Sequence, residues 1–471
     1  MRVRQFLSFR SIWLDEASFA HGILDNGLFD LLTTKQRFVD PIGFVVSTKL
    51  GTQVFGQTEF AFRWIALLAG VASVGIAALL ALRVFRSGLG RVVFTALVAI
   101  SPVLVYYSDE AQQYSLDVLS VLLILWVFAS YRSWDRGFLY LVLVGAILPW
   151  FSYSAVIVMF GVGVVLAIRW LREKEYAKLL GLGSVWGITA FVSLFHARLI
   201  TRTDFLEDYW LTGFAPFPPL SSGDVRWYAD APAGIVEIGW FIEGFVQRVV
   251  TPSLASYFIL ALIAVGLYLL ARRLRGLALA IGVIGVAALI VSILELYPFG
   301  SRPGIYMVPI AFLLAVEPID NAASRRSLLW RLPAVLVSLA LLAAPAISSA
   351  QTLVTPHNSS DMKSALAYVE AHQQPGDWLV VHGWSSRAFE FYAPRYDLRP
   401  AVTLEVSNEF DVDLFLSEIG IVPGRERTWV IFSHRIRESR EFVDELAERA
   451  TLLDRSDGEY VVALFDFSAL D

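Results

Sequence analysis

Residues 60–85 read FAFRWIALLAGVASVGIAALLALRVF, and this run decides the kind of protein to expect. A helix needs about 20 mainly apolar residues to cross the hydrocarbon core of a bilayer. The run exceeds that length, and its charged residues, Arg63 and Arg83, lie near its two ends. It therefore predicts a transmembrane helix.

Further apolar stretches before residue 351 are long enough, or nearly so, to do the same. Two of them, 138–150 and 303–317, are short. The whole set predicts a polytopic α-helical membrane protein with about ten spans. The predicted spans are residues 60–85, 91–107, 114–131, 138–150, 152–171, 179–200, 254–272, 276–297, 303–317 and 328–350.

The composition excludes several classes of protein. Of the 471 residues, 56% are hydrophobic and 17% are charged, whereas soluble chains carry roughly 45–50% apolar and about 25% charged residues. A soluble enzyme and a disordered chain are therefore excluded. The formal net charge of −5 gives no sign of a nucleic-acid partner. The absence of cysteine excludes disulfides, thiolate metal sites and cysteine nucleophiles.

Basic residues predict the orientation, because Lys and Arg concentrate in cytoplasmic loops. They occupy alternate short loops, while the short loops between contain only Arg302. The pattern predicts a multi-pass protein of a bacterial-type inner (plasma) membrane, with residues 1–59, the loop 201–253 and the C-terminal domain outside. The basic loop residues are Arg83, Arg86, Arg91, Arg132, Arg136, Arg169, Arg172, Lys174, Lys178, Arg272, Arg273, Arg275, Arg325, Arg326 and Arg331.

The N-terminus is unusual in this topology, because Met1–Arg10 has no apolar run that could act as a signal. Either the first helix inserts in an unusual way, or the start is truncated and one N-terminal span is missing. We favour the second interpretation. The long loop 201–253 is either a plain connector or carries an interfacial helix over a groove for a lipid substrate.

We place the domain boundary near residue 350. Residues 351–471 hold 11 Lys and Arg against 21 Asp and Glu. Helix signals over Met362–His372 and Glu438–Arg449, with strand signals over Trp378–His382, Thr428–Ser433 and Tyr460–Phe467, predict a small extracytoplasmic α/β domain. It contains no catalytic pattern, and we interpret it as a structural or acceptor-side cap.

Two acidic pairs stand in predicted external segments. Asp15 and Glu16 follow Trp13, and Asp109 and Glu110 follow the predicted span 91–107. Acids at the end of an apolar span are costly unless they are hydrated, paired or bound to a cation. Asp117 lies seven residues after Glu110, on the same face if the turn is helical. Carboxylates of this kind suit Mg²⁺, Mn²⁺ or Ca²⁺.

At these residues the chain resembles the polyprenyl-phosphate-dependent membrane glycosyltransferases of the GT-C type, which include protein O-mannosyltransferases and lipid A aminoarabinose transferases. The resemblance covers most of residues 10–320 in order and spacing. It departs from the family at Gln112, where the family often has Arg, and at Phe151-Ser152-Tyr153, where it often has a Thr-His-Tyr-like element. The matching motifs are Trp13-Leu-Asp15-Glu16, Phe55-Gly56-Gln-Thr-Glu59-Phe-Ala-Phe-Arg63-Trp, Ser101-Pro102, Tyr107-Ser-Asp109-Glu110-Ala-Gln-Gln-Tyr114 and Ser301-Arg302-Pro-Gly-Ile-Tyr306 with Pro309.

The resemblance implies transfer of a sugar from a polyprenyl phosphate to an acceptor hydroxyl, with inversion, at the outer side of the membrane. Such chemistry needs a base for the acceptor proton and positive charge for the leaving phosphate. We predict Asp15 as the base, with Glu16 in support. Asp109 and Glu110 would bind a divalent cation or orient the acceptor.

Arg302 and, more weakly, Arg63 are the predicted phosphate-binding residues, although Arg302 could instead be a helix-end side chain that reaches into water. Tyr114 and Tyr153 stand in or beside these motifs and are predicted to line the substrate groove. The predicted partners are the polyprenyl-linked sugar, a glycan, lipid or protein acceptor, and membrane lipids. A transporter or lipid flippase is the main alternative, and an inactive scaffold of the cell envelope is a third.

Overall fold

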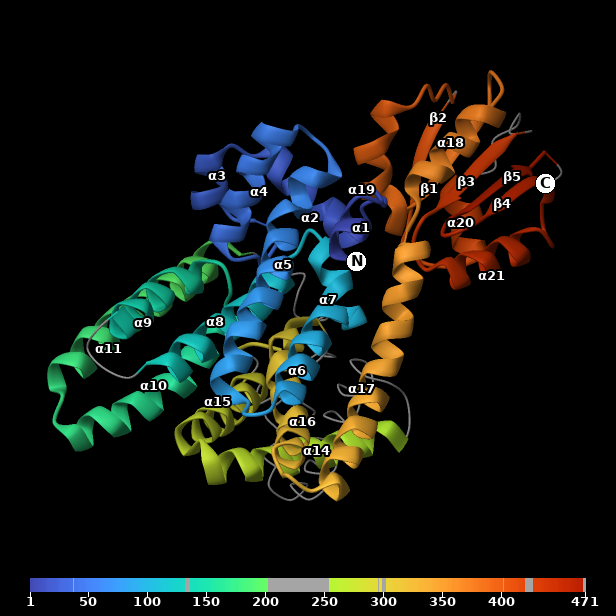
Figure 1. The fold of residues 1–471 in the computed structure, drawn as a ribbon. Helices are drawn as coiled ribbons and strands as arrows, with labels where there is room; N and C mark the ends of the chain where they lie inside the picture. The colour runs from blue at the N-terminus through green and yellow to red at the C-terminus, as the bar shows by residue number, and fades with distance from the viewer. Residues whose placement is uncertain are drawn as a thin grey trace, which may run out of the picture. The chain divides into compact units, whose positions relative to one another are not determined.

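The computed structural model describes most of the chain (Figure 1). The described residues are 1–471 except 37, 132–135, 202–253, 295, 299–301, 359, 401, 420–426 and 469–471. The helix predicted within the loop 201–253 lies outside the described residues.

The chain divides into two compact units, which we describe separately. The helical unit comprises Met1–Gln5, Leu28–Gly51 and Arg63–Thr355, and the sheet unit comprises Phe6–Gly27, Thr52–Phe62 and Pro356–Asp471. The prediction of a single domain over residues 1–350 differs from this division. Two N-terminal segments, one of which carries Asp15 and Glu16, belong to the same unit as the C-terminal domain.

Every stretch predicted to cross the membrane is helical. Helices long and apolar enough to span a bilayer are α5 (Glu59–Val84), α10 (Ser154–Glu173), α11 (Tyr176–Ile200), α15 (Arg275–Ile293), the segment Arg302–Ala323, and α17 (Leu328–Val354). The segment Arg302–Ala323 consists of the 3₁₀ turn η4 (Arg302–Met307) and α16 (Val308–Ala323). The multi-pass architecture is confirmed, but six such helices in the described part of the chain do not confirm the predicted count.

The other predicted spans have a different form. The stretch 91–107 is broken at Ser101 into α6 (Gly88–Ile100) and α7 (Pro102–Tyr106), and the pair is bent by 51°. Ser101 precedes a proline, and this position disfavours helical backbone. Two apolar helices are shorter, α8 (Tyr114–Ser130) and α9 (Arg136–Ile147), the second of which is followed by the 3₁₀ turn η2 (Leu148–Trp150). Helix α14 (Leu254–Arg273) corresponds to the predicted span 254–272.

Helices α14 and α16 approach closely because a glycine lies at their contact. A Cβ atom built on Gly266 of α14 would come within 1.8 Å of the carbonyl oxygen of Leu314 in α16. Small residues at helix contacts allow this kind of backbone approach in membrane proteins. Helix α16 is largely buried within the helical unit, and the side chains of Leu313 and Val316 are fully buried.

Two buried acids of α16 tie neighbouring helix ends together. Arg273, at the end of α14, donates to both carboxylate oxygens of Glu317, with 2.9 Å between Nε and Oε1. Asp320 accepts hydrogen bonds from the backbone N–H and the hydroxyl of Ser87, both at 2.7 Å, and from the N–H of Arg86 at 3.0 Å. A carboxylate that accepts several N–H and O–H bonds is a strong local clamp.

The sheet unit contains five strands in the order β2-β1-β3-β5-β4. Strand β1 pairs in parallel with β2 and β3, while β5 runs antiparallel to β3 and β4. The predicted strands correspond to β1, β3 and β5, and the sequence reading missed β2 and β4. The bounds are β1 (Trp378–His382), β2 (Val402–Val406), β3 (Thr428–Phe432), β4 (Thr451–Asp457) and β5 (Val461–Asp466).

Helices pack against this sheet through alternate strand residues. Val380, Val430 and Ala463 face a core that includes Phe415 of α20 and Phe442 of α21. The helices of the C-terminal part are α18 (Met362–His372), α19 (Gly383–Tyr392), η5 (Ala393–Arg395), α20 (Val412–Ile419) and α21 (Ile436–Leu446). The remaining N-terminal helices are α1 (Arg2–Phe6), α2 (Leu14–Asp25), α3 (Leu28–Thr33) and α4 (Ile42–Phe55).

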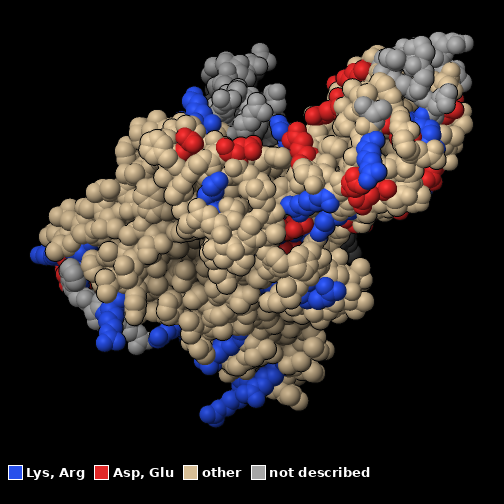
Figure 2. Space-filling model, turned by 90° about the horizontal axis from the view of Figure 1, so that it is seen from above, with Lys and Arg blue, Asp and Glu red and all other residues tan. Residues whose placement is uncertain are grey.

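The charge distribution distinguishes the two units. On the face in Figure 2, most of the helical unit's surface is uncharged, whereas the sheet unit carries gathered acidic and basic side chains. Large apolar side chains such as Leu180, Phe191 and Leu329 are well exposed on the helical unit. Such a surface suits lipid rather than water.

We expect Gly266→Ala to destabilise the helical unit, because the added Cβ has no space beside Leu314. Overpacking of this kind typically costs about 1–3 kcal/mol. The matched control is Gly282→Ala in α15, where an added Cβ meets nothing within 4 Å. Thermal unfolding of the purified chain in detergent should show a lower midpoint for Gly266→Ala alone, and equal midpoints would contradict the packing described.

Candidate active site

The first acidic pair divides into one buried and one accessible carboxylate. Helix α2 begins at Leu14, and the backbone N–H of Trp13 donates to Oε2 of Glu16 at 3.3 Å. The Arg10 guanidinium donates to Oε2 at 3.3 Å and to Oε1 at 3.4 Å. Glu16 and Arg10 are both buried, whereas Asp15 is only half-buried. Glu16 therefore fixes the start of the helix, and Asp15 is presented at its first turn.

The backbone before this helix is held by a buried tyrosine of α19. The hydroxyl of Tyr392 accepts the N–H of Ile12 at 2.9 Å and donates to Oε1 of Glu59 at 2.8 Å. Lys363 of α18 forms an ion pair with the same Oε1 at 3.1 Å and also donates to the carbonyl of Phe9. All these residues belong to the sheet unit.

Ser11 provides a second link between this N-terminal segment and the C-terminal domain. Its hydroxyl donates to Asp361 at 3.2 Å and accepts the backbone N–H of Lys363 at 3.2 Å. The segment that carries Asp15 is thus fixed at three consecutive positions, Arg10, Ser11 and Ile12. Within the sheet unit, side chains of the C-terminal domain hold the acidic loop in place through these contacts.

The second acidic pair lies in the helical unit, in an irregular turn. Tyr107–Asp109 form a 3₁₀ turn, and Glu110 has extended backbone with φ −124° and ψ 138°. Helix α8 begins only at Tyr114. Glu110 and Asp117 do not share the helical face expected for a helical turn, because residues 110–113 lie outside helix and only Asp117 belongs to α8. Asp109, Glu110 and Asp117 are each fully buried.

Close packing explains the position of this turn. A Cβ atom on Gly70 of α5 would lie 2.5 Å from Cβ of Ser108, so the turn rests against the helix backbone there. Gln5 donates to Oδ2 of Asp109 at 3.4 Å. Arg2 donates to the carbonyls of Ala99 and Val98, at 2.6 and 2.8 Å, at the break between α6 and α7.

Several predicted residues meet around Tyr114. The charges of Arg302, Glu110 and Asp40 all lie within electrostatic range of its phenol. The Tyr107 and Tyr114 rings are 4.9 Å apart in an edge-on arrangement. Tyr114, Arg302 and Glu110 thus share one polar site, which we call the Tyr114 site.

Tyr153 and Asp40 extend the Tyr114 site. The Tyr153 hydroxyl donates to the carbonyl of Asp40 at 3.3 Å. Arg63 is 1% exposed within α5.

The structure adds polar residues that the sequence analysis did not single out as site residues. Oδ1 of Asp117 accepts hydrogen bonds from the hydroxyls of Ser152 at 2.6 Å and Ser154 at 3.0 Å. Tyr297 lies within electrostatic range of Asp117, Tyr306, Tyr114 and Tyr153. In the sequence, the one sign of this contact was the departure from the family pattern at Ser152, because a serine hydroxyl can donate a hydrogen bond to a buried carboxylate.

The donor set for a divalent cation is limited. Among the residues that the structure describes, no three His, Asp or Glu side chains are grouped closely enough to hold a metal ion. Glu110 and Asp40 do share the surroundings of Tyr114. Mg²⁺ usually takes one or two carboxylates and completes its shell with water and substrate phosphate, so such an ion does not need a cage of protein side chains.

No protein-family model matches the chain, and no curated protein matches it. Among solved structures it is similar to the Archaeoglobus fulgidus oligosaccharyltransferase in the apo form, with TM-score 0.50 and 13% identity over 93% of this chain and 65% of that chain. The chain has the GT-C fold of membrane glycosyltransferases. It is also similar to ArnT from Cupriavidus metallidurans bound to undecaprenyl phosphate, with TM-score 0.48 and 14% identity over 98% of this chain and 96% of that one.

The predicted resemblance is thereby confirmed at the level of the fold. The chain spans less than two thirds of the archaeal enzyme's length, at 65%.

We expect Tyr392→Phe to destabilise the sheet unit. The change removes a hydroxyl that serves Ile12 and Glu59, and a buried polar group left without its partner costs about 1–3 kcal/mol. Tyr140→Phe is the control, because Tyr140 is 47% exposed on α9. A lower unfolding midpoint for Tyr392→Phe alone would support the anchoring role, and identical midpoints would refute it.

Proposed function

We propose that the chain is an integral membrane glycosyltransferase that moves a sugar from a polyprenyl-phosphate donor to an acceptor hydroxyl. In this proposal the reaction occurs on the extracytoplasmic side of a bacterial-type inner membrane, with inversion at the anomeric carbon. The GT-C fold supports the class of enzyme. The observation that carries the proposal is the half-buried Asp15, presented beside a Glu16 that is fully engaged by Arg10 and Trp13.

Asp15 is the proposed general base. The acceptor oxygen attacks the anomeric carbon as its proton passes to the Asp15 carboxylate, and the bond between that carbon and the phosphate oxygen breaks. Polyprenyl phosphate leaves with the electron pair. A base positioned in this way typically contributes about 10²–10⁴-fold to the rate. Glu16 takes no proton in this scheme, because Arg10 holds both of its oxygens.

Arg302 is the proposed ligand of the leaving phosphate. It lies at the start of η4, near Tyr114, Glu110 and Asp40. A guanidinium can bind phosphate through two parallel hydrogen bonds, which is the geometry that suits charge developing on the leaving group. Tyr114 and Tyr153 would line the donor groove. Arg63, which is buried in α5, stays the weaker prediction for this role.

Glu110, with Asp109 beside it, is proposed to hold a divalent cation or to orient the acceptor. A bound cation would neutralise charge on the donor phosphate. Asp109 also accepts a hydrogen bond from Gln5, which favours a fixed orientation of its carboxylate. Removal of divalent ions with EDTA distinguishes the two roles, because only the cation role predicts a loss of transfer that added Mg²⁺ restores.

A transporter or flippase is the second candidate, and one observation favours it. Asp117 is fully buried in the first turn of α8 and accepts two serine hydroxyls, as an ion- or proton-binding acid would. Sugar transfer by the purified chain would decide for the enzyme, whereas donor-independent translocation without transfer would decide for the transporter.

We expect Asp15→Asn to lower transfer from a labelled polyprenyl-phosphate sugar by about 10²-fold or more, without lowering the unfolding midpoint. The control is Asp25→Asn, which changes an exposed acid at the other end of the same helix. Transfer would be measured as label incorporated into endogenous acceptors by membranes that contain each variant. Equal transfer in Asp15→Asn and wild type would remove the assigned base.

A further inference from the structure

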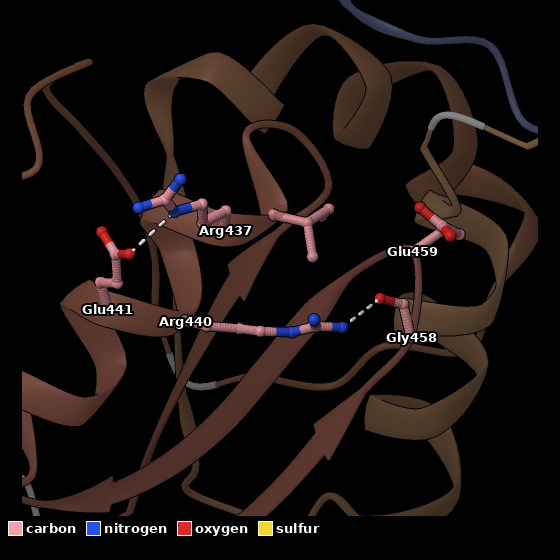
Figure 3. A pocket seen from close by; sticks show the side chains of 6 residues that line it. Arg437, Arg440, Glu441, Gly458 and Glu459 are labelled. Carbon is pink, nitrogen blue, oxygen red and sulfur yellow. Dashed lines mark hydrogen bonds and ion pairs between the residues drawn. The ribbon is translucent and has the colours of Figure 1, made fainter.

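A polar pocket opens on the sheet unit, beside helix α21. It has a volume of about 420 Å³ and is lined by Ile436, Arg437, Arg440, Glu441, Gly458 and Glu459. We call it the Arg437 pocket. Figure 3 shows Arg437 and Glu441 paired on one side, Arg440 reaching across to Gly458, and Glu459 on the opposite side. Pockets that bind small molecules have volumes of about 300–1,000 Å³.

The lining contains both hydrogen-bond donors and acceptors. Arg437 Nε lies 3.0 Å from Oε1 of Glu441, and an Arg440 nitrogen donates to the Gly458 carbonyl at 3.0 Å, while Arg440 Nε lies 3.6 Å from Asp457. Each guanidinium carries five N–H donors, so these contacts leave further donors on each side chain. With two arginines and two glutamates, the pocket's lining has no net charge. Such a mixture suits a ligand that both donates and accepts hydrogen bonds at neighbouring positions.

Backbone strain stands directly before the pocket wall. Arg435 has φ 49° and ψ 54°, the left-handed region that a side chain other than glycine rarely adopts. Its guanidinium lies over the Trp384 ring, 5.2 Å from the centroid. Strained residues of this kind cost about 1–3 kcal/mol and cluster at functional sites. The strain directs Ile436 and Arg437 into α21, and both residues line the pocket.

Aromatic rings stand on the other side of the same strained residue. His434 stacks on Trp13 with ring centroids 5.9 Å apart, and Trp384 lies 6.0 Å from His434. Trp13 is also the residue that precedes helix α2 and Asp15.

The opposite wall connects with the same acidic loop. The carbonyl of Glu459 accepts the N–H of Asp361 at 2.9 Å, and Asp361 accepts the Ser11 hydroxyl. His357 lies within electrostatic range of both Arg10 and Glu459. The pocket and the Asp15 loop are therefore parts of one connected structure within the sheet unit.

We propose that the Arg437 pocket binds one neutral sugar ring of the acceptor, so that the acceptor of this enzyme is a saccharide. The assignment of this saccharide as acceptor rests on the proposed function. Vicinal hydroxyls of a sugar ring, which both donate and accept hydrogen bonds, match the arginine donors and glutamate acceptors of the lining. A phosphate or other anion matches the pocket less well, because Glu441 and Glu459 offset the two arginines.

The test is direct binding of saccharides to the full chain, purified in detergent. The probe is a printed array of neutral, amino and anionic oligosaccharides, followed by titration calorimetry of the neutral saccharide that binds best. The variants are Arg437→Ala and Glu441→Ala. The matched control is Arg449→Ala, which breaks an exposed ion pair with Asp413 outside the pocket. Unfolding midpoints check that each variant is folded.

We expect a neutral saccharide to bind to the wild type and to the control with the same Kd. Each pocket variant should weaken that Kd by about tenfold or more, the loss expected for one hydrogen bond to a charged group. Binding of anionic saccharides alone, binding of no saccharide, or equal Kd values in all variants would overturn the proposal. If the wild type binds the saccharide but transfers no sugar to it, the result counts against the proposed function and not against the binding site, because binding needs no donor.

Discussion

The buried ion pair between Arg10 and Glu16 is the interaction on which the account of this protein depends. Removing one partner of such a pair leaves an uncompensated buried charge, at a cost of about 3–5 kcal/mol. The pair fixes the first turn of α2 and leaves Asp15 half-buried at that turn. Tyr392, Lys363 and Asp361 then hold the backbone that precedes the pair. Glu16 thus holds the loop, and its half-buried neighbour Asp15 is the proposed base.

In this arrangement the C-terminal domain stabilises the loop that carries Asp15. Its sheet provides a rigid frame for α18 and α19, and these helices provide the side chains that hold residues 9–12. The helical unit positions a separate set of polar residues around Tyr114, at a turn packed against α5. The proposed base therefore belongs to the sheet unit, and the proposed phosphate ligand with its companion acids belongs to the helical unit.

Much of this could be predicted from the sequence, and the reasons for the failures are physical. Apolar runs such as 60–85 and 328–350 predicted helices that the structure contains, because span length is set by the bilayer. The carboxylates were visible as acids at the ends of apolar runs. Tyr392 could not be identified as important, because its partners Glu59 and Ile12 are 333 and 380 residues away in the chain. The strand β4 was missed because Asp454 and Asp457 make its sequence unlike a buried strand.

The central claim is that Asp15 accepts the acceptor's proton while Glu16 only holds the loop. The most direct measurement is kcat for sugar transfer together with the unfolding midpoint, compared among wild type, Asp15→Asn and Glu16→Gln. The account predicts a low kcat with an unchanged midpoint for Asp15→Asn, and a lowered midpoint for Glu16→Gln, because the buried Arg10 loses its charged partner. A rate for Asp15→Asn close to that of the wild type would contradict it.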